Sequence, residues 1–245
     1  NLLFLLPINK AYSLLYFIHT LMAGSFMYLL VNHLVNNPLS ATLSAICFMF
    51  SGFMSCRIWA GHYEVFITSI WIPLVFYLFH TQHPVLCALV LAIQFFAGHT
   101  QTSFYTILMI MIYGFGRSWF MLSSATLVLA GAFTAVQLIP TWRFVKLSTR
   151  ANGLPLKYCM YGSLNPEGLL RFIAPSIFGN FLKTKDYGDP ILGEVYWEHC
   201  YYIGLIPLYL ALTQFNLWGI SLVILMVAFL MRVTFLCLKE HFLPG

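Results

Sequence analysis

Two copies of an aromatic-Ala-Gly-His motif stand out, and each is followed by an apolar run. The first copy is Trp59–His62 and the second is Phe96–His99, so the two histidines are 37 residues apart. Imidazole nitrogens donate to phosphate oxygens and sugar hydroxyls, but they also cap helices and bond neighbouring helices. For either histidine alone, such a structural role is the simpler interpretation. The repetition favours a shared binding site that contains His62 and His99.

Polar residues flank both copies of the motif. Arg57 and Glu64 lie on either side of the first copy, and Gln101 follows the second. The planar guanidinium fork of Arg57 suits phosphate oxygens, although an arginine near a membrane surface also extends toward the headgroups. We therefore predict that Arg57, His62, His99 and Gln101 bind substrate, and that Glu64 is the second candidate for a catalytic carboxylate. No residue is predicted to bind a metal.

Most of the charge lies in the long segment 140–200. Within it, Arg143, Lys146 and Arg150 recur at spacings of three and four, which places them on one face of a helix leaving the membrane. A solvated helix face and a phosphate-binding patch at headgroup level are both consistent with this pattern. We predict that these three residues bind substrate. Glu198, between Trp197 and His199, is the carboxylate that we would test first as catalytic.

The composition requires a membrane around these residues. Hydrophobic residues make up 60% of the 245 residues and charged residues 8%, whereas soluble domains carry roughly a quarter charged residues. Mean hydropathy is +0.83. The net charge of +5 comes without any run of Lys or Arg, so nothing indicates nucleic-acid binding. The bilayer is the solvent for most side chains.

The apolar runs predict an all-α, polytopic transmembrane helical bundle with about eight spans. We place the spans near 12–34, 39–56, 64–80, 84–97, 100–116, 119–139, 201–214 and 217–235. Several are shorter than the roughly 20 residues of a simple crossing, which predicts short or broken helices. Residues 1–245 are expected to form a single transmembrane domain, with 140–200 as a segment outside the bilayer.

If every span crosses once, the polar residues gather on one side of the membrane. Residues 57–64, 98–101 and 140–200 would then share a face, whereas the opposite connections are short turns. Broken helices are tolerated in a bilayer where protein or a watery cavity covers them. This arrangement predicts a site at one membrane surface.

An ordered set of motifs gives the chain a family resemblance. The motifs are Phe50–Phe53, Arg57-x-Trp59–His62, Trp71-x-Pro73-Leu74, Ala97–Gln101, Ala135–Leu138 with Pro140, Phe178–Asn180, Tyr196-x-Glu198, Tyr202-x-Gly204-x-x-Pro207-Leu208 and the terminal Leu243–Gly245. In this order and over nearly the whole chain they resemble the bacterial YfhO-like membrane proteins, which are similar to the GT-C class of multi-spanning glycosyltransferases.

The resemblance implies a function. Enzymes of the GT-C class use a polyprenyl-phosphate sugar as donor, and some YfhO-like members are implicated in decorating cell-envelope polymers. The expected activity is therefore transfer of a sugar from a polyprenyl-phosphate donor to a cell-envelope glycan or lipid acceptor. The expected location is the bacterial cell membrane, with the active face and segment 140–200 extracytoplasmic. No cofactor is expected, and a divalent metal stays open.

The chain departs from the family pattern in two respects. GT-C enzymes carry an acidic residue in the first outer loop, and we expect this chain to begin, at Asn1, after that loop. We expect a fragment that lacks both ends and is inactive by itself. In addition, Lys and Arg are concentrated in and near segment 140–200, which by the positive-inside rule would be cytoplasmic. Basic residues that bind donor phosphate would account for that exception.

Three other interpretations stay open. A transporter or flippase of lipid-linked sugars also uses broken helices and repeats. A haem protein would use histidines within the spans, such as His19. A membrane subunit without catalytic activity is the third alternative.

Overall fold

The chain is all-helical wherever its fold is described. The computed structural model describes residues 7–148, 151, 153, 170–174, 177, 202–205 and 207–209. Its helices between residues 8 and 147 are α1 (Ile8–Val35), α2 (Pro38–Met49), α3 (Gly52–Trp59), α4 (Tyr63–Ser69), α5 (Ile72–His80), α6 (Pro84–Phe96), α7 (Thr100–Gly116) and α8 (Phe120–Leu147). The chain divides into two compact units, Asn1–Ala135 and Val136–Gly245, and the first contains both histidine motifs.

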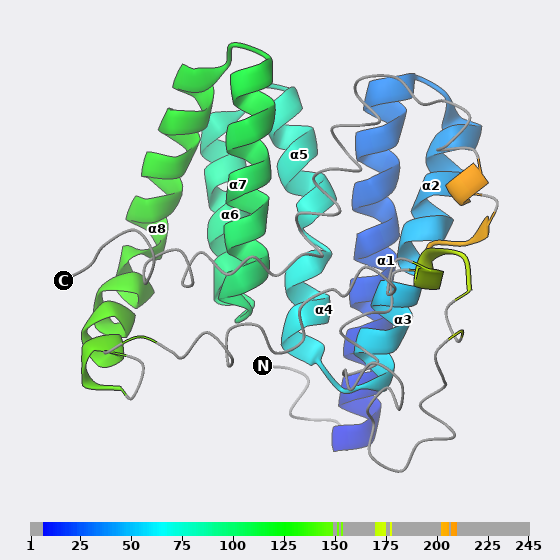
Figure 1. Cartoon of the computed structure of the whole chain (residues 1–245), viewed down its shortest axis with the longest axis horizontal. Coiled ribbons are helices and arrows are strands. Elements are labelled where there is room, and N and C mark those ends of the chain that lie inside the picture. Colours follow the sequence, from blue (N-terminus) through cyan, green and yellow to red (C-terminus); the bar gives the residue numbers. More distant parts are fainter. Residues whose placement is uncertain are drawn as a thin grey trace. The chain divides into compact units, whose positions relative to one another are not determined.

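The helices of the first unit run back and forth as successive passes (Figure 1). α2 and α3 together form one pass, and so do α4 and α5. Four passes are long and apolar enough to cross a membrane: Ile8–Val35, Pro38–Trp59, Tyr63–His80 and Phe120–Leu147. The chain is therefore a membrane protein. The first six expected spans each coincide with helix, whereas the last two lie largely outside the described residues, so the total of eight stays a prediction.

Two of the passes are broken in the middle, as the short apolar runs predicted. α2 ends at Met49, and Ser51 then caps α3 by accepting a hydrogen bond from the N–H of Met54 (3.4 Å). α4 ends at Ser69, and α5 begins at Ile72 with Pro73 in its first turn. Proline has no N–H to donate, so it starts a helix more readily than it continues one.

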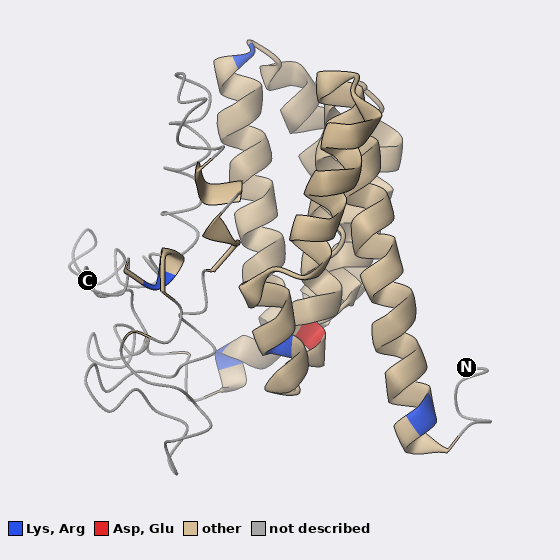
Figure 2. Cartoon of the chain, turned by 90° about the vertical axis from the view of Figure 1, so that its right-hand side faces the viewer, with Lys and Arg blue, Asp and Glu red and all other residues tan. Residues whose placement is uncertain are grey.

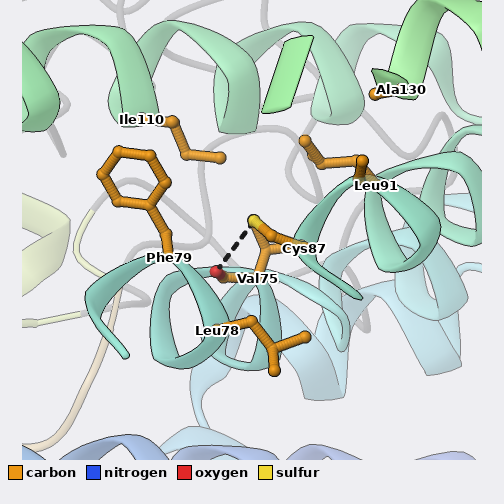
Figure 3. Close-up of a cluster of buried hydrophobic side chains, with 8 residues drawn as sticks. Val75, Leu78, Phe79, Cys87, Leu91, Ile110 and Ala130 are labelled. Atoms are coloured by element: carbon orange, nitrogen blue, oxygen red, sulfur yellow. Dashed lines mark hydrogen bonds between the residues drawn. The ribbon is translucent and has the colours of Figure 1, made fainter. Parts of the chain in front are cut away.

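Two hydrophobic clusters hold the first unit together. One cluster joins α1, α3 and α4 through Ala23, Met54, Phe66 and Ile70. The other joins α5 to α8 around Val75, Phe79, Cys87 and Ile110, and Figure 3 shows these side chains converging from their helices. The Cys87 thiol lies 3.5 Å from the Val75 carbonyl oxygen. Because α4 contributes to the first cluster and α5 to the second, the pass that these two helices form connects the clusters.

Charged residues are rare in the described helices and leave long uncharged stretches, as Figure 2 shows. Between residues 7 and 135 they are Lys10, Arg57, Glu64 and Arg117. Two of these four belong to the predicted site beside His62.

In the second unit, the described residues include the end of α8. This helix continues to Leu147 with Pro140 inside it, which agrees with the helix expected to carry Arg143 and Lys146. Arg143 and Lys146 therefore lie on this helix and are exposed, as residues 136–147 all are. Arg150 and most of the rest of the segment lie outside the described residues.

Candidate functional site

The first Gly-His motif forms a tight turn between α3 and α4. α3 ends at Trp59, and the N–H groups of Gly61 and His62 donate back to the carbonyls of Ile58 (3.2 Å) and Arg57 (3.0 Å). This is the Schellman pattern, which places the residue after the cap in the left-handed region. Gly61 has φ +72° there, and His62 then becomes the N-cap residue of α4.

The second motif forms an equivalent turn between α6 and α7. α6 ends at Phe96, Gly98 has φ +108°, and its N–H donates to the Phe95 carbonyl (3.2 Å). His99 is the N-cap residue of α7. The repeat is therefore a structural repeat in which glycine ends one helix and histidine starts the next.

The two turns lie beside each other at one end of the unit (Figure 1). A Cβ atom added to Gly98 would lie 3.7 Å from the Cβ of Glu64, on the first turn of α4. The N–H of His99 donates to the hydroxyl oxygen of Thr68 on α4 (3.3 Å). In the first turn, the corresponding N–H group, that of His62, donates to the Arg57 carbonyl at the end of α3. The hydrogen bond from His99 instead connects the second turn to α4, the helix that begins after His62.

Arg57 and His62 form a direct pair. The Arg57 side chain is 6% exposed, its Nη1 lies 3.0 Å from His62 Nδ1, and its guanidinium lies 5.3 Å from the centre of the Phe53 ring. Arginine only donates hydrogen bonds, so His62 Nδ1 accepts and the ring carries its proton on Nε2. The Arg57 side chain is therefore packed inside the protein rather than exposed at its surface.

His99 has the same tautomer for a different reason. Its Nδ1 accepts a hydrogen bond from the N–H of Thr102 (3.3 Å) and lies 2.6 Å from the Thr102 hydroxyl. The proton is therefore on Nε2 here too. The capping role considered from the sequence is confirmed for His99. For His62 no side-chain cap is formed, because its Nδ1 pairs with Arg57.

The other predicted residues of the first unit lie at the same end. Glu64 is exposed on the first turn of α4, where a carboxylate also complements the positive end of the helix dipole. Gln101, on the first turn of α7, donates from Nε2 to the Tyr105 hydroxyl (2.7 Å). The turns thus bring together a guanidinium, two imidazoles, a carboxylate and an amide.

The remaining predicted residues belong to the second unit. Arg143 and Lys146 lie one turn apart on α8, and Lys146 Nζ lies 5.4 Å from the centre of the Trp142 ring. Arg150 and Glu198 lie outside the described residues. The predicted substrate-binding and catalytic roles of all four stay predictions.

Four polar residues beneath the turns were not predicted from the sequence. Thr68, Gln94, Thr102 and Thr106 are buried and hydrogen-bonded to one another or to His99. The one available signal was Gln94, an amide near the end of the apolar run 84–97.

In the described part of the chain, no group of three or more His, Cys, Asp or Glu side chains is placed to hold a metal ion. Comparison of the chain with protein-family models, with curated proteins and with solved structures found no match.

Proposed function

We propose that this chain belongs to a bacterial membrane glycosyltransferase of the GT-C type, which moves a sugar from a polyprenyl-phosphate donor to a cell-envelope acceptor. The observation that carries the proposal is the buried Arg57 guanidinium, paired with His62 at the end of an apolar bundle. Ionisable side chains inside membrane segments are expensive and mark substrate pathways. The YfhO-like motifs in the sequence supply the reaction class.

The chemistry requires a cationic site for the leaving phosphate. The acceptor oxygen bonds to the anomeric carbon, the bond from that carbon to the phosphate oxygen breaks, and the phosphate leaves with the electron pair. A carboxylate takes the proton of the acceptor hydroxyl. Arg57 would stabilise the phosphate charge, with imidazole N–H groups of His62 and His99 as further donors. Glu198 is our first candidate for the base and Glu64 our second.

The experiment uses the complete protein in nanodiscs with a labelled polyprenyl-phosphate sugar. We expect the wild type to release free polyprenyl phosphate, and Arg57→Ala and Glu198→Gln to abolish release while expression stays normal. Arg57→Lys keeps the charge but not the fork, so it should retain partial activity. Arg117→Ala, on the connection between α7 and α8, is the matched arginine control. Wild-type turnover in both Arg57→Ala and Glu198→Gln would show that the site is elsewhere.

A transporter or flippase of lipid-linked sugars is the second candidate, because two passes are broken at mid-length. The same assay distinguishes the two functions. Release of free polyprenyl phosphate supports sugar transfer. Movement of the intact lipid-linked sugar between leaflets, without cleavage, supports transport.

A further inference from the structure

Gln94 on α6 joins the helices that carry the two histidine turns. Its side chain is 0% exposed. Its Nε2 donates to the Thr68 carbonyl oxygen on α4 (3.1 Å) and to the Thr106 hydroxyl oxygen on α7 (2.9 Å). An amide nitrogen has two N–H donors, so these two acceptors use both.

Both acceptors lead to the turns. The Thr68 hydroxyl donates to the Glu64 carbonyl (2.6 Å) and accepts from the N–H of His99 (3.3 Å). The Thr106 hydroxyl donates to the Thr102 carbonyl (3.0 Å), and Thr102 in turn contacts His99 Nδ1. Gln94 therefore bonds to Thr68, a residue that itself bonds to His99, and to Thr106, whose hydroxyl bonds to the other His99 partner, Thr102.

The two buried acceptors, the Thr68 carbonyl and the Thr106 hydroxyl, require a side chain with two N–H donors at position 94. Gln94 Oε1 has no hydrogen-bond partner among the described residues, whereas both N–H groups are occupied. A side chain with one donor would leave one of two buried acceptors unpaired. An unpaired buried hydrogen-bonding group destabilises the packed arrangement. Glutamine at this position thus favours one fixed placement of α4 against α7.

We infer that Gln94 is a positioning residue, whose two N–H groups hold α4 and α7 together and thereby fix the His99 ring beside the turn that carries His62 and Glu64. This inference rests on the proposed binding of a phosphate by these turns. Gln94 itself is separated from the histidine rings by the intervening threonines. It acts through Thr68 and Thr106 rather than by touching the substrate.

The test combines a ligand-free readout with a binding readout on the full chain in nanodiscs. Nitrogen NMR of labelled histidine reports which ring nitrogen of His99 carries the proton. Binding of polyprenyl phosphate is compared with binding of the neutral polyprenol. We expect Gln94→Leu to turn the single His99 tautomer into a mixture. We expect its affinity for polyprenyl phosphate to fall about tenfold, as for one lost net hydrogen bond, with polyprenol binding unchanged.

Three more variants make the test specific. Gln94→Glu keeps the size of the side chain and, protonated, offers one donor, so its effect should be intermediate even if Gln94→Leu does not fold. Thr68→Val removes the hydroxyl that accepts from His99 and should also disturb the His99 signals. Thr134→Val is the matched control, because the Thr134 hydroxyl is likewise buried but donates within its own helix to the Ala130 carbonyl (2.8 Å).

The outcomes separate this inference from the proposed function. Unchanged His99 signals in folded Gln94→Glu and Thr68→Val protein would overturn the positioning role. Altered signals in these variants but not in Thr134→Val support it. If they change while wild-type protein binds polyprenyl phosphate no better than polyprenol, the positioning role stands and the proposed phosphate site fails.

Discussion

Replacing Gly61 with alanine tests the turn on which the site depends. Gly61 has φ +72°, and a Cβ atom added there would meet no other atom within 4 Å. The substitution therefore causes no clash, and its cost comes from the backbone alone. A non-glycine residue in the left-handed region costs about 1–2 kcal/mol. Gly61→Ala should lower the free energy of unfolding by that amount.

Gly131 provides the matched control. It lies within α8, and a Cβ atom added there would also meet nothing within 4 Å. Because alanine is favoured over glycine inside a helix, Gly131→Ala should stabilise the protein by about 0.5–1 kcal/mol. The same chemical change thus has opposite signs at the two positions. Gly61→Asn should cost less than Gly61→Ala, because asparagine tolerates the left-handed region better.

Thermal unfolding of the detergent-solubilised protein, followed by tryptophan fluorescence, measures these differences. We expect the melting temperature to fall for Gly61→Ala, to fall less for Gly61→Asn and to rise for Gly131→Ala. If Gly61→Ala raises the melting temperature as much as Gly131→Ala does, Gly61 is helical. α3 and α4 would then be one continuous helix, and the turn that presents His62 would not exist.

Two further predictions concern the packing and the opposite end of the unit. Gly114→Val should destabilise the protein by about 1–3 kcal/mol, because a side chain there would meet the side chains of Phe79 and of Ser123 on α8. Gly116→Val is the control: a Cβ atom there meets nothing within 4 Å, so the melting temperature should stay closer to that of the wild type. The His33 and His80 rings are joined by a 3.0 Å hydrogen bond between α1 and α5. His33→Leu removes this bond and should lower the free energy of unfolding by about 0.5–1.5 kcal/mol, and an unchanged melting temperature would contradict this prediction.

The sequence alone determined the membrane character and the helix boundaries at the two Gly-His turns. Both depend on local properties: the apolar runs require lipid, and Gly61 and Gly98 favour a helix end wherever the chain goes. The aromatic-Ala-Gly-His repeat likewise predicted two matching helix starts, which the structure confirms.

Only the tertiary structure decided how these parts meet. The burial of Arg57, its pairing with His62 and the contact of Gly98 with Glu64 depend on how separate passes pack. Gln94 illustrates the physical reason most clearly, because its two partners lie 26 and 12 residues away on different helices. Local periodicity shows which residues face inward along one helix. It does not show which donor on that helix will meet which acceptor on another.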